Sequence, residues 1–446
     1  MPVKIAMIGG GSSSFVPPLV RQFIRSEVLG DARLALMDVN EERVRVMEAL
    51  AKKLVDAEGS NLEVSSTLDQ REAIADADFV IVAISVGGMG AWELDMEIPG
   101  KHGLIMHVAD SIGPGGLMRT LRNAPVQASV ARDVAEVGAP DAWVFNYTNP
   151  APVEALSMLT VPGVNVISLC SCTAAPSSRA WLAARAGVDP DEIAMPPIVA
   201  GINHCASVKE LRATDGTNLV PGMLDHVENP VERWALQTYG VLPYCWTHWT
   251  EFYPQLQRLE QEYEGTAQSV KMRYGITTHN MEYERSRPRM LADLAKQWTA
   301  PDAGPVTLAD LPPGDEEEGI EVIEILEAIV ANRNEVHIVN APNNGAIPNL
   351  PSDAMVEVTA RVNRYGVHPI YTGPIHEALA GHLSHYVSMQ RQMVRAALTG
   401  DRRAALHALL LDPTTASTLD ADETEAMLDE LLAAQAEHLP LFAAAA

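Results

Sequence analysis

Residues 3–15 read VKIAMIGGGSSSF, an apolar run followed by three glycines and three serines. The run predicts a buried strand, and the residues after it, FVPPLVRQFIR, have the apolar spacing of a helix. A G-x-G-x-x-G pattern lies between this strand and this helix. Gly9, Gly11 and Ser14 occupy its three glycine positions, with serine at the third. Glycines let a backbone approach a pyrophosphate, and a helix start offers unpaired N–H donors. The stretch therefore predicts a dinucleotide site. Its loop residues are Gly9, Gly10, Gly11, Ser12, Ser13 and Ser14.

The same order of strand and helix continues after this stretch. ARLALMDVN predicts a second strand, EERVRVMEALAKKLVDAEG an amphipathic helix, and ADFVIVAISVGG and AWVFNYTNP further buried strands. Asp38 ends the second strand, where a carboxylate can bind ribose hydroxyls and would repel a 2′-phosphate, so NAD is favoured over NADP. We expect Arg43, Ser85 and Asn149 to line the same cofactor site.

These patterns predict an α/β fold of two domains. Residues 1–200 are expected to form a Rossmann-like doubly wound sheet that binds NAD. Residues 201–446 are expected to form a mixed α/β, helix-rich domain for substrate binding and oligomerisation, because HEALAGHLSHYVSMQRQMVRAAL and ETEAMLDELLAAQAEHL are both amphipathic.

Composition excludes several classes of function. A formal charge of −26 over 446 residues disfavours nucleic acid, because affinity for a phosphate backbone requires clustered lysine and arginine. The sequence has neither an apolar run long enough for a membrane span nor a signal-peptide core, so we expect a cytoplasmic protein. Its four cysteines are too few for a disulfide scaffold and are expected to stay reduced.

Several further segments occur in a family-specific order: KIAMIGGGSSSFVPPLV, DADFVIVAISVGG, IPGKHGLI, SIGPGGLMRTLRNAPV, DAWVFNYTNPA, GINH, NAPNNGAIPNLPSDAMVEV and ALLLDP. Together they resemble glycoside hydrolase family 4, the NAD-dependent glycosidases, whose fold is related to that of lactate and malate dehydrogenases. The resemblance implies a redox route. NAD removes hydride from sugar C3, a base takes the C2 proton, the C1 group leaves, water adds and the hydride returns.

The resemblance also implies a divalent metal, usually Mn²⁺. The matching ligands are Cys170 of SLCSCTAAP and His204 of GINH, whereas Cys172 is expected only to pack. A thiolate and an imidazole are nevertheless softer ligands than manganese prefers. Asp110 stands where the family usually has glutamate, and it is expected to protonate the leaving oxygen.

The sequence departs from the family at the position of the catalytic base and at the residues that recognise the substrate. Trp246 occupies the position of the base and cannot accept a proton, so His248, Tyr147 and Tyr244 are the candidate bases, with His248 first. Residues expected to contact substrate are Asn149, Trp92, Ser171, Asn203, Trp246 and Arg119.

An arginine that pairs with phosphate in the phosphosugar enzymes is absent from the segment Gly90-Ala91-Trp92. The substrate prediction is therefore a sulfoquinovoside, a 6-sulfonated glucoside, as in the NAD-dependent sulfoquinovosidases of family 188. A sulfonate carries one charge and can be held by neutral N–H and O–H donors.

Three alternatives stay open from the sequence. The first is another hexosidase with the same mechanism, acting on a neutral, uronic or 6-phospho sugar. The second is a net NAD-dependent oxidoreductase on a sugar or hydroxy acid, and the third is a non-catalytic dinucleotide sensor. The resemblance further suggests a homodimer or homotetramer.

Overall fold

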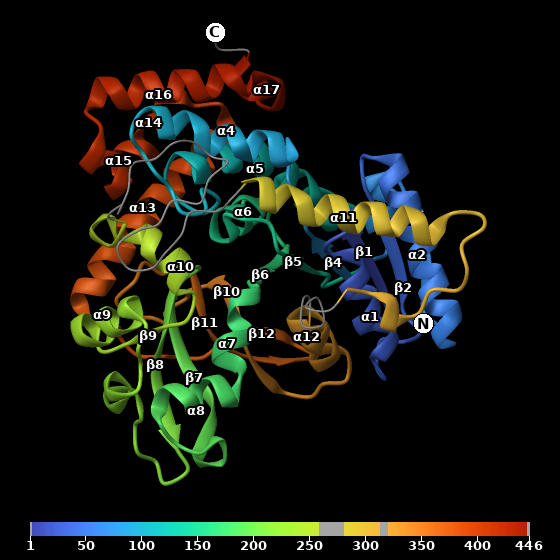
Figure 1. Ribbon diagram of the computed structural model, residues 1–446, viewed down its shortest axis with the longest axis horizontal. Coiled ribbons are helices and arrows are strands. Elements are labelled where there is room, and N and C mark those ends of the chain that lie inside the picture. The colour runs from blue at the N-terminus through green and yellow to red at the C-terminus, as the bar shows by residue number, and fades with distance from the viewer. Residues whose placement is uncertain (1, 258–280, 313–319, 444–446) are drawn as a thin grey trace.

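One sheet of twelve strands runs through the computed structural model, which describes residues 2–257, 281–312 and 320–443 (Figure 1). Six strands are parallel, in the order β3-β2-β1-β4-β5-β6, which is that of a doubly wound dinucleotide-binding fold. The predicted fold class is confirmed. The six are β1 (Lys4–Ile8), β2 (Arg33–Met37), β3 (Glu63–Thr67), β4 (Phe79–Val82), β5 (Trp143–Asn146) and β6 (Asn165–Ser168).

Helices cover both faces of this parallel part because its strands are apolar on both sides. Ile5 and Met7 of β1 belong to the core beneath α1 (Val16–Arg25) and α2 (Glu41–Glu58). Ala6 and Ile8 belong to the core on the opposite face, beneath α3 (Gln70–Ile74), α5 (Gly113–Val137) and α6 (Ala151–Met158). The alternation follows from the two-residue period of a strand.

The sheet continues without a break into the second half of the chain. β10 (Glu335–Pro342) pairs with β6 between Asn340 and Ser168, and antiparallel strands follow it. These are β11 (Met355–Asn363), β7 (Ile193–Ile202), β8 (Cys205–Ala213) and β9 (Leu242–Pro243), with β12 (Gly366–Pro369) on β11. Beside them lie α7 (Ala174–Ser177), α8 (Arg179–Ala186), α9 (Pro230–Tyr239), α10 (Trp246–Trp249) and α12 (Ile320–Val330). The division at residue 200 stays a prediction.

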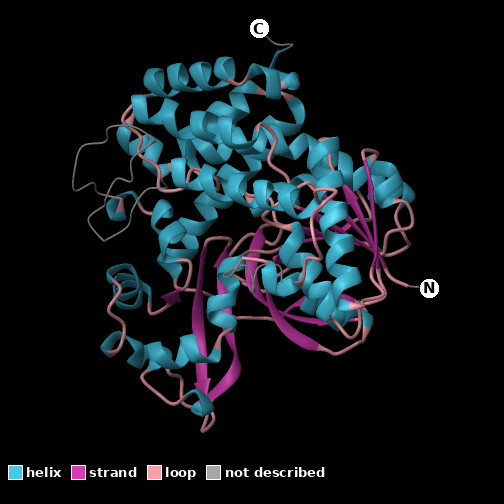
Figure 2. Cartoon of the chain, turned by 45° about the vertical axis from the view of Figure 1, so that its right-hand side comes forward, coloured by secondary structure: helices cyan, strands magenta, loops and turns pink. Residues whose placement is uncertain are grey.

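Helices of the carboxyl-terminal region stack on α5 in a separate layer (Figure 2). They are α13 (Glu377–Thr399), α14 (Arg402–Leu411), α15 (Pro413–Thr418), α16 (Ala421–Ala434) and α17 (Pro440–Ala443), with α4 (Gly88–Lys101) beside them. α11 (Met281–Thr299) crosses α2, where Lys296 pairs with Glu42 at 2.6 Å. None of the helices within the described ranges is long and apolar enough to span a membrane.

A buried ion pair joins α4 and α5 to the carboxyl-terminal end. Arg122 donates to both carboxylate oxygens of Asp95, at 2.8 and 2.6 Å, and Gln435 donates to Asp95 at 2.8 Å. Both charged side chains are at most 1% exposed. Burial raises the pKa of Asp95, and the bonds from Arg122 and Gln435 oppose that rise. Desolvation offsets much of the attraction within such a pair, but removal of one partner leaves the other charge buried and unpaired, which destabilises the fold.

Asp95→Ala is therefore expected to lower the free energy of unfolding by about 3–5 kcal/mol, because it leaves the Arg122 charge buried without its partner. Urea denaturation followed by circular dichroism measures the change. The matched control is Glu425→Ala, which breaks the exposed pair with Arg402 and is expected to cost less than about 1 kcal/mol. Equal losses in the two variants would contradict this account.

Candidate functional site

The glycine-rich loop is tied to the end of β2. The N–H groups of Gly9 and Gly10 both donate to the Met37 carbonyl, at 2.9 and 2.7 Å. Gly11 N–H donates to Asp38 Oδ2 at 2.9 Å, and Asn40 N–H donates to Asp38 Oδ1 at 2.9 Å. Each carboxylate oxygen can accept further bonds, so Asp38 can still receive ribose hydroxyls. The predicted loop and its carboxylate are thus brought together.

The other loop residues shape the start of α1. Ser12 Oγ accepts from Phe15 N–H at 3.2 Å, and Ser13 Oγ donates to the Pro288 carbonyl of α11 at 3.1 Å. The first turn of α1 offers no free N–H donor. Val16 N–H donates to the Ser12 carbonyl at 3.0 Å, Pro17 and Pro18 have no N–H, and Leu19 N–H donates to the Phe15 carbonyl at 3.3 Å. Arg43 lies close to Gly11, in the first turn of α2. The positive end of the α1 dipole and the nearby Arg43 side chain suit an anionic group at the loop.

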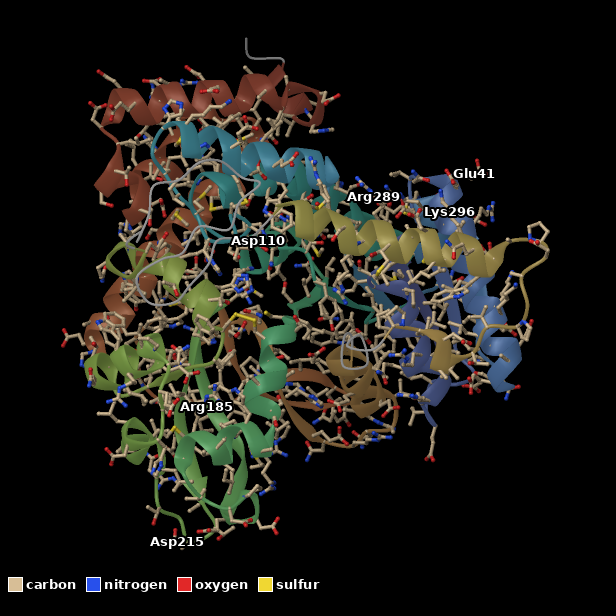
Figure 3. The ribbon with its side chains drawn as sticks, viewed as in Figure 1. Glu41, Asp110, Arg185, Asp215, Arg289 and Lys296 are labelled. Atoms are coloured by element: carbon tan, nitrogen blue, oxygen red, sulfur yellow. A yellow bond between two sulfur atoms is a disulfide. The ribbon has the colours of Figure 1, made fainter. Side chains whose placement is uncertain are left out.

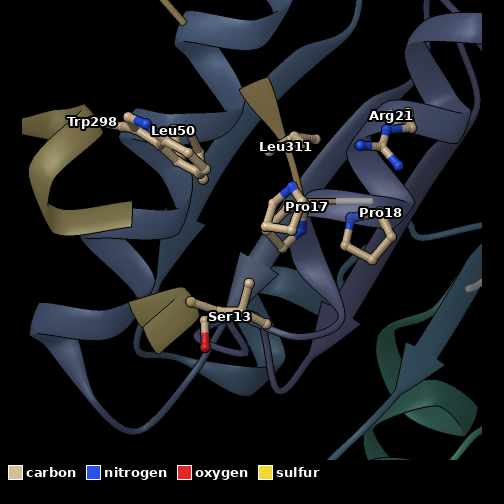
Figure 4. Close-up of a pocket in the computed structure, with 9 residues that line it drawn as sticks. Ser13, Pro17, Pro18, Arg21, Leu50, Trp298 and Leu311 are labelled. Atoms are coloured by element: carbon tan, nitrogen blue, oxygen red, sulfur yellow. The ribbon is translucent and has the colours of Figure 1, made fainter. Parts of the chain in front are cut away.

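A pocket lies between α1, α2, α11 and the segment that follows α11 (Figure 4). It is narrow and partly open to solvent, with room for about one water molecule. Its lining is Ser13, Pro17, Pro18, Arg21, Leu50, Leu291, Trp298, Leu311 and Pro312. Because it shares only Ser13 with the predicted site, it does not contain the chemistry described below.

Asp110 is the centre of a second polar group, near the middle of the molecule (Figure 3). Ser111 Oγ donates to Asp110 Oδ1 at 2.6 Å, and Asn149 Nδ2 donates to Asp110 Oδ2 at 2.8 Å. Arg119 Nε donates to the Asn149 carbonyl at 3.0 Å. Asn149 follows β5 as Gly9 follows β1, so the group lies at the same edge of the parallel sheet as the dinucleotide loop.

The bonds of Ser111 fix the tautomer of His204. Ser111 Oγ lies 2.7 Å from His204 Nδ1, and its single proton is already donated to the Asp110 carboxylate. Nδ1 of His204 must therefore carry the proton and donate it to Ser111. In the neutral ring this leaves a lone pair on Nε2, which suits a metal ligand or a base. Burial lowers the pKa of His204 and favours the neutral ring, although Asp110 opposes this.

The charges around Asp110 keep it ionised. Burial raises its pKa, whereas His248 and His204 when protonated, the guanidinium of Arg119 and the hydrogen bond from Ser111 together bring the pKa below the usual range. An ionised carboxylate accepts a proton more readily than it donates one. The predicted role of Asp110 as a proton donor thus requires that it first receive a proton.

The candidate bases differ in their surroundings. Burial raises the pKa of Tyr244, and its hydroxyl donates to Glu357. Burial also raises the pKa of Tyr147, which packs on Phe15 at 5.4 Å between ring centres and donates to Glu321 at 3.5 Å. His248 stacks on His204 with 3.9 Å between ring centres. His248 is thus the candidate base that lies against the Asp110 group.

Glu357 of β11 is a buried carboxylate that sequence reasoning missed. Asn203 Nδ2, Asn340 Nδ2 and the Tyr244 hydroxyl all donate to it, the two amides at 2.7 and 2.9 Å. Burial raises its pKa, and these bonds oppose the rise. A charge inside the apolar strand MVEVTARV was the available signal, because a buried carboxylate requires partners. Ser111 was also missed.

Cys170 lies beside this buried group. Burial raises the pKa of its thiol, whereas a hydrogen bond with Asn203 lowers it. The Asn203 Oδ1 atom is buried without a hydrogen-bond partner among the described residues. An acceptor is therefore available next to Cys170 for a bound group.

Cys172 does more than pack, and this corrects the sequence interpretation. Cys172 and Cys245 form a disulfide, although all four cysteines were expected to be reduced (Figure 3). Their sulfurs lie with one nitrogen each of His204 and His248 in a group whose atoms are all within 4.8 Å of one another. No local sequence pattern indicates this pairing, because 73 residues separate the two cysteines.

Three of the residues expected to contact substrate lie together, because Arg119 donates to the Asn149 carbonyl and lies over the Trp92 ring. Trp92 donates its Nε1–H to the Val108 carbonyl at 2.8 Å, so that N–H is already engaged, and its ring lies 6.0 Å from the Arg119 guanidinium. Ser171 is exposed, and Trp246 is half-buried against the helical core. Ser85, which was expected to line the cofactor site, is also exposed. Their roles stay predictions.

Two family models match the chain. The family 4 glycosyl hydrolase model matches residues 4–179, and the model of that family's C-terminal domain matches residues 199–415. A probable 6-phospho-beta-glucosidase of Bacillus subtilis is 30% identical over 99% of this chain and 98% of its own length. An alpha-galactosidase of the same species is 28% identical over 98% and 99%.

Solved structures show the same fold. A 6-phospho-alpha-glucosidase from gut microorganisms, in complex with NAD and Mn²⁺, has a TM-score of 0.79 at 22% identity, covering 98% of both chains. The 6-phospho-beta glucosidase of Thermotoga maritima, with manganese, NAD⁺ and glucose-6-phosphate, has a TM-score of 0.78 at 20% identity, covering 98% of this chain and 99% of its own.

Proposed function

The chain belongs to the family 4 glycosyl hydrolases, and we propose that it cleaves a hexoside by transient, NAD-dependent oxidation at sugar C3. The observation that carries the proposal is the position of two groups at one edge of the parallel sheet. The glycine-rich loop with Asp38 follows β1 and β2, and Asn149, bonded to Asp110, follows β5. Ligands of doubly wound sheets bind at this edge.

Different residues are proposed to bind the cofactor and to transfer protons. The loop from Gly9 to Ser14 receives the pyrophosphate, and Asp38 receives the adenosine ribose. His248 is proposed to take the C2 proton. Asp110, which is ionised, is proposed to accept the proton of a sugar hydroxyl and then to donate it to the leaving oxygen. When bound, NAD accepts a hydride and a divalent metal polarises adjacent sugar oxygens.

The residues present fit a divalent metal. Ser111 orients His204 so that Nε2 keeps its lone pair, and the buried Oδ1 of Asn203 is an acceptor beside Cys170. Cys170 and His204 are the pair that the resemblance implies. They stay a proposal, and so does the assignment of Mn²⁺.

The substrate is proposed to be a sulfoquinovoside, with neutral, uronic and 6-phospho hexosides as alternatives. Ser171 is exposed at the edge of the sheet and offers a neutral donor, and Arg119 adds one positive charge near Asn149. Trp92 is not proposed to donate to the sulfonate, because its Nε1–H already donates to the Val108 carbonyl. The names of the relatives favour 6-phosphoglucosides and non-phosphorylated galactosides as the alternatives to test first. A cytoplasmic homodimer or homotetramer is also proposed, and light scattering measures the oligomer.

The test is a panel of aryl hexosides, plain, 6-phosphorylated, 6-sulfonated and uronic, assayed with a catalytic amount of NAD and with Mn²⁺ or a chelator. We expect aryl release without net NADH, because the hydride returns to the sugar in each cycle. A matched reaction without NAD is the control. Stoichiometric NADH without aryl release would show an oxidoreductase instead. Binding of NAD without turnover of any sugar would show a sensor.

A further inference from the structure

We propose that Cys172, His204, Cys245 and His248 form a tetrahedral site for a thiophilic divalent cation, Zn²⁺ in the first place, when the two cysteines are reduced. The four side chains offer two sulfurs and two nitrogens, all within 4.8 Å of one another. Around one tetrahedral zinc ion, such atoms stand roughly 3.3–3.8 Å apart, given Zn–N and Zn–S bonds of about 2.0–2.3 Å. The two sulfurs, which are bonded to each other in the disulfide, would have to move apart to this spacing once reduced. Cys245 Sγ already lies 3.2 Å from His248 Nδ1, so this sulfur–nitrogen pair needs little adjustment.

Three separate elements position these ligands. Cys172 lies in the 3₁₀ turn Ser171–Thr173 after β6, and His204 lies in the turn between β7 and β8 with a φ of 65°. Cys245 precedes α10 and His248 is on it, three residues apart and thus on one side of the helical turn. His204 and Cys245 are 2% and 3% exposed, whereas the other two are half-buried. Cys172 and His248 are thus the two members of the set that reach toward solvent.

Hydrogen bonds already orient one of the imidazoles for a metal. His204 donates Nδ1–H to Ser111, which donates to the Asp110 carboxylate, so Nε2 is the atom left to bind an ion. Histidine ligands commonly donate their other N–H to a carboxylate or an oxygen in this way, which fixes the ring and strengthens the ligand.

Reduction of the disulfide must precede metal binding. A phosphine reductant supplies two electrons to the Cys172–Cys245 bond, and two protons complete the thiols. Binding of Zn²⁺ then releases both protons, which gives two thiolates, two neutral imidazoles and no net charge. The disulfide and the metal are mutually exclusive states of the same two sulfurs.

This set differs from the pair that the resemblance implies. It shares His204 but leaves out Cys170, and its two thiolates make it softer than a site with a single thiolate. Soft S₂N₂ sets in tetrahedral geometry select zinc over manganese, which prefers oxygen ligands. The zinc-bound state and the hydrolytic state exclude each other, because His248 cannot be a zinc ligand and the proposed base at once, and His204 cannot bind both ions. The test of the zinc site measures metal ligation alone, so its outcome does not depend on the proposed hydrolysis.

The experiment uses the full chain, reduced with a phosphine under anaerobic conditions and titrated with Co²⁺. We expect one Co²⁺ per chain, with thiolate-to-cobalt charge transfer and the strong visible bands of four-coordinate cobalt, both removed by Zn²⁺. Cys172→Ala and Cys245→Ala are each expected to lower the charge-transfer absorption by about half or more, because one of two thiolates is lost. Cys170→Ala and Cys205→Ala are the matched controls and are expected to keep it.

X-ray absorption of the zinc-loaded wild type keeps the test independent of how well the variants fold. Two sulfur and two nitrogen neighbours around zinc are expected. One sulfur, or loss of the cobalt charge transfer in Cys170→Ala with its retention in Cys172→Ala, would assign the metal to Cys170 and overturn the proposal. Absence of any thiolate signal from the reduced wild type would overturn it as well.

Discussion

Gly9→Val is expected to lower the affinity for NAD by about 100-fold or more and to remove NAD-dependent hydrolysis with it. Gly9 has a φ of 98°, and a Cβ built there would lie 2.1 Å from the Ala83 carbonyl oxygen. Both obstacles are backbone features, so a side-chain movement cannot relieve them. A displacement that costs about 3 kcal/mol corresponds to the stated loss of affinity. Calorimetric titration with NAD measures it.

The matched control for this variant is Gly90→Ala in α4, where a Cβ meets no atom within 4 Å. Gly90→Ala is expected to keep the affinity for NAD within about twofold, as is usual for a change that costs less than about 0.5 kcal/mol. Circular dichroism of both variants separates loss of binding from loss of folding. A folded Gly9→Val protein that binds NAD as the wild type does would contradict the placement of the cofactor at this loop.

The dinucleotide loop could be predicted because its determinants are close together in the sequence. The strand at residues 4–8, the glycines and the helix from Val16 follow one another directly, and each has a local pattern. Asp38 was found in the same way, because it follows the next strand. Its bond to Gly11 confirms that the end of one strand and the loop after another meet, as parallel pairing requires.

The polar groups around Asp110 could not be predicted in full, because their contacts join distant segments. Ser111 meets His204 across 93 residues, and Asn203 meets Glu357 across 154 residues. A local sequence pattern carries no information about contacts between residues so far apart in the chain. The prediction that Cys172 and Cys245 are reduced was wrong for a further reason. It rested on the small number of cysteines and on the redox state of the cytoplasm, and it took no account of how the ends of β6 and α10 meet in the fold.

Asp110→Asn is expected to lower kcat/KM on the best aryl hexoside of the panel by about 10²–10⁴-fold, the usual contribution of a positioned proton-transfer group. Both carboxylate oxygens accept hydrogen bonds, one from Ser111 and one from Asn149. An amide replaces one of these acceptors with a donor, so one bond is lost and the group can no longer take up a proton. The affinity for NAD is expected to fall far less than kcat/KM. Neither the glycine-rich loop nor Asp38 takes part in these bonds, and the bond from Asn149 can be accepted by the amide oxygen of the variant.

The control for Asp110→Asn is the same substitution at Asp215, an exposed carboxylate on the hairpin after β8, far from Asp110 (Figure 3). Asp215→Asn is expected to leave kcat/KM unchanged within experimental error. Steady-state kinetics at several pH values then separates the possible roles of Asp110. Proton transfer through Asp110 predicts that the variant stays slow at every pH, since an amide does not titrate in this range. A loss of less than tenfold that falls on KM alone would reduce Asp110 to a substrate-positioning residue.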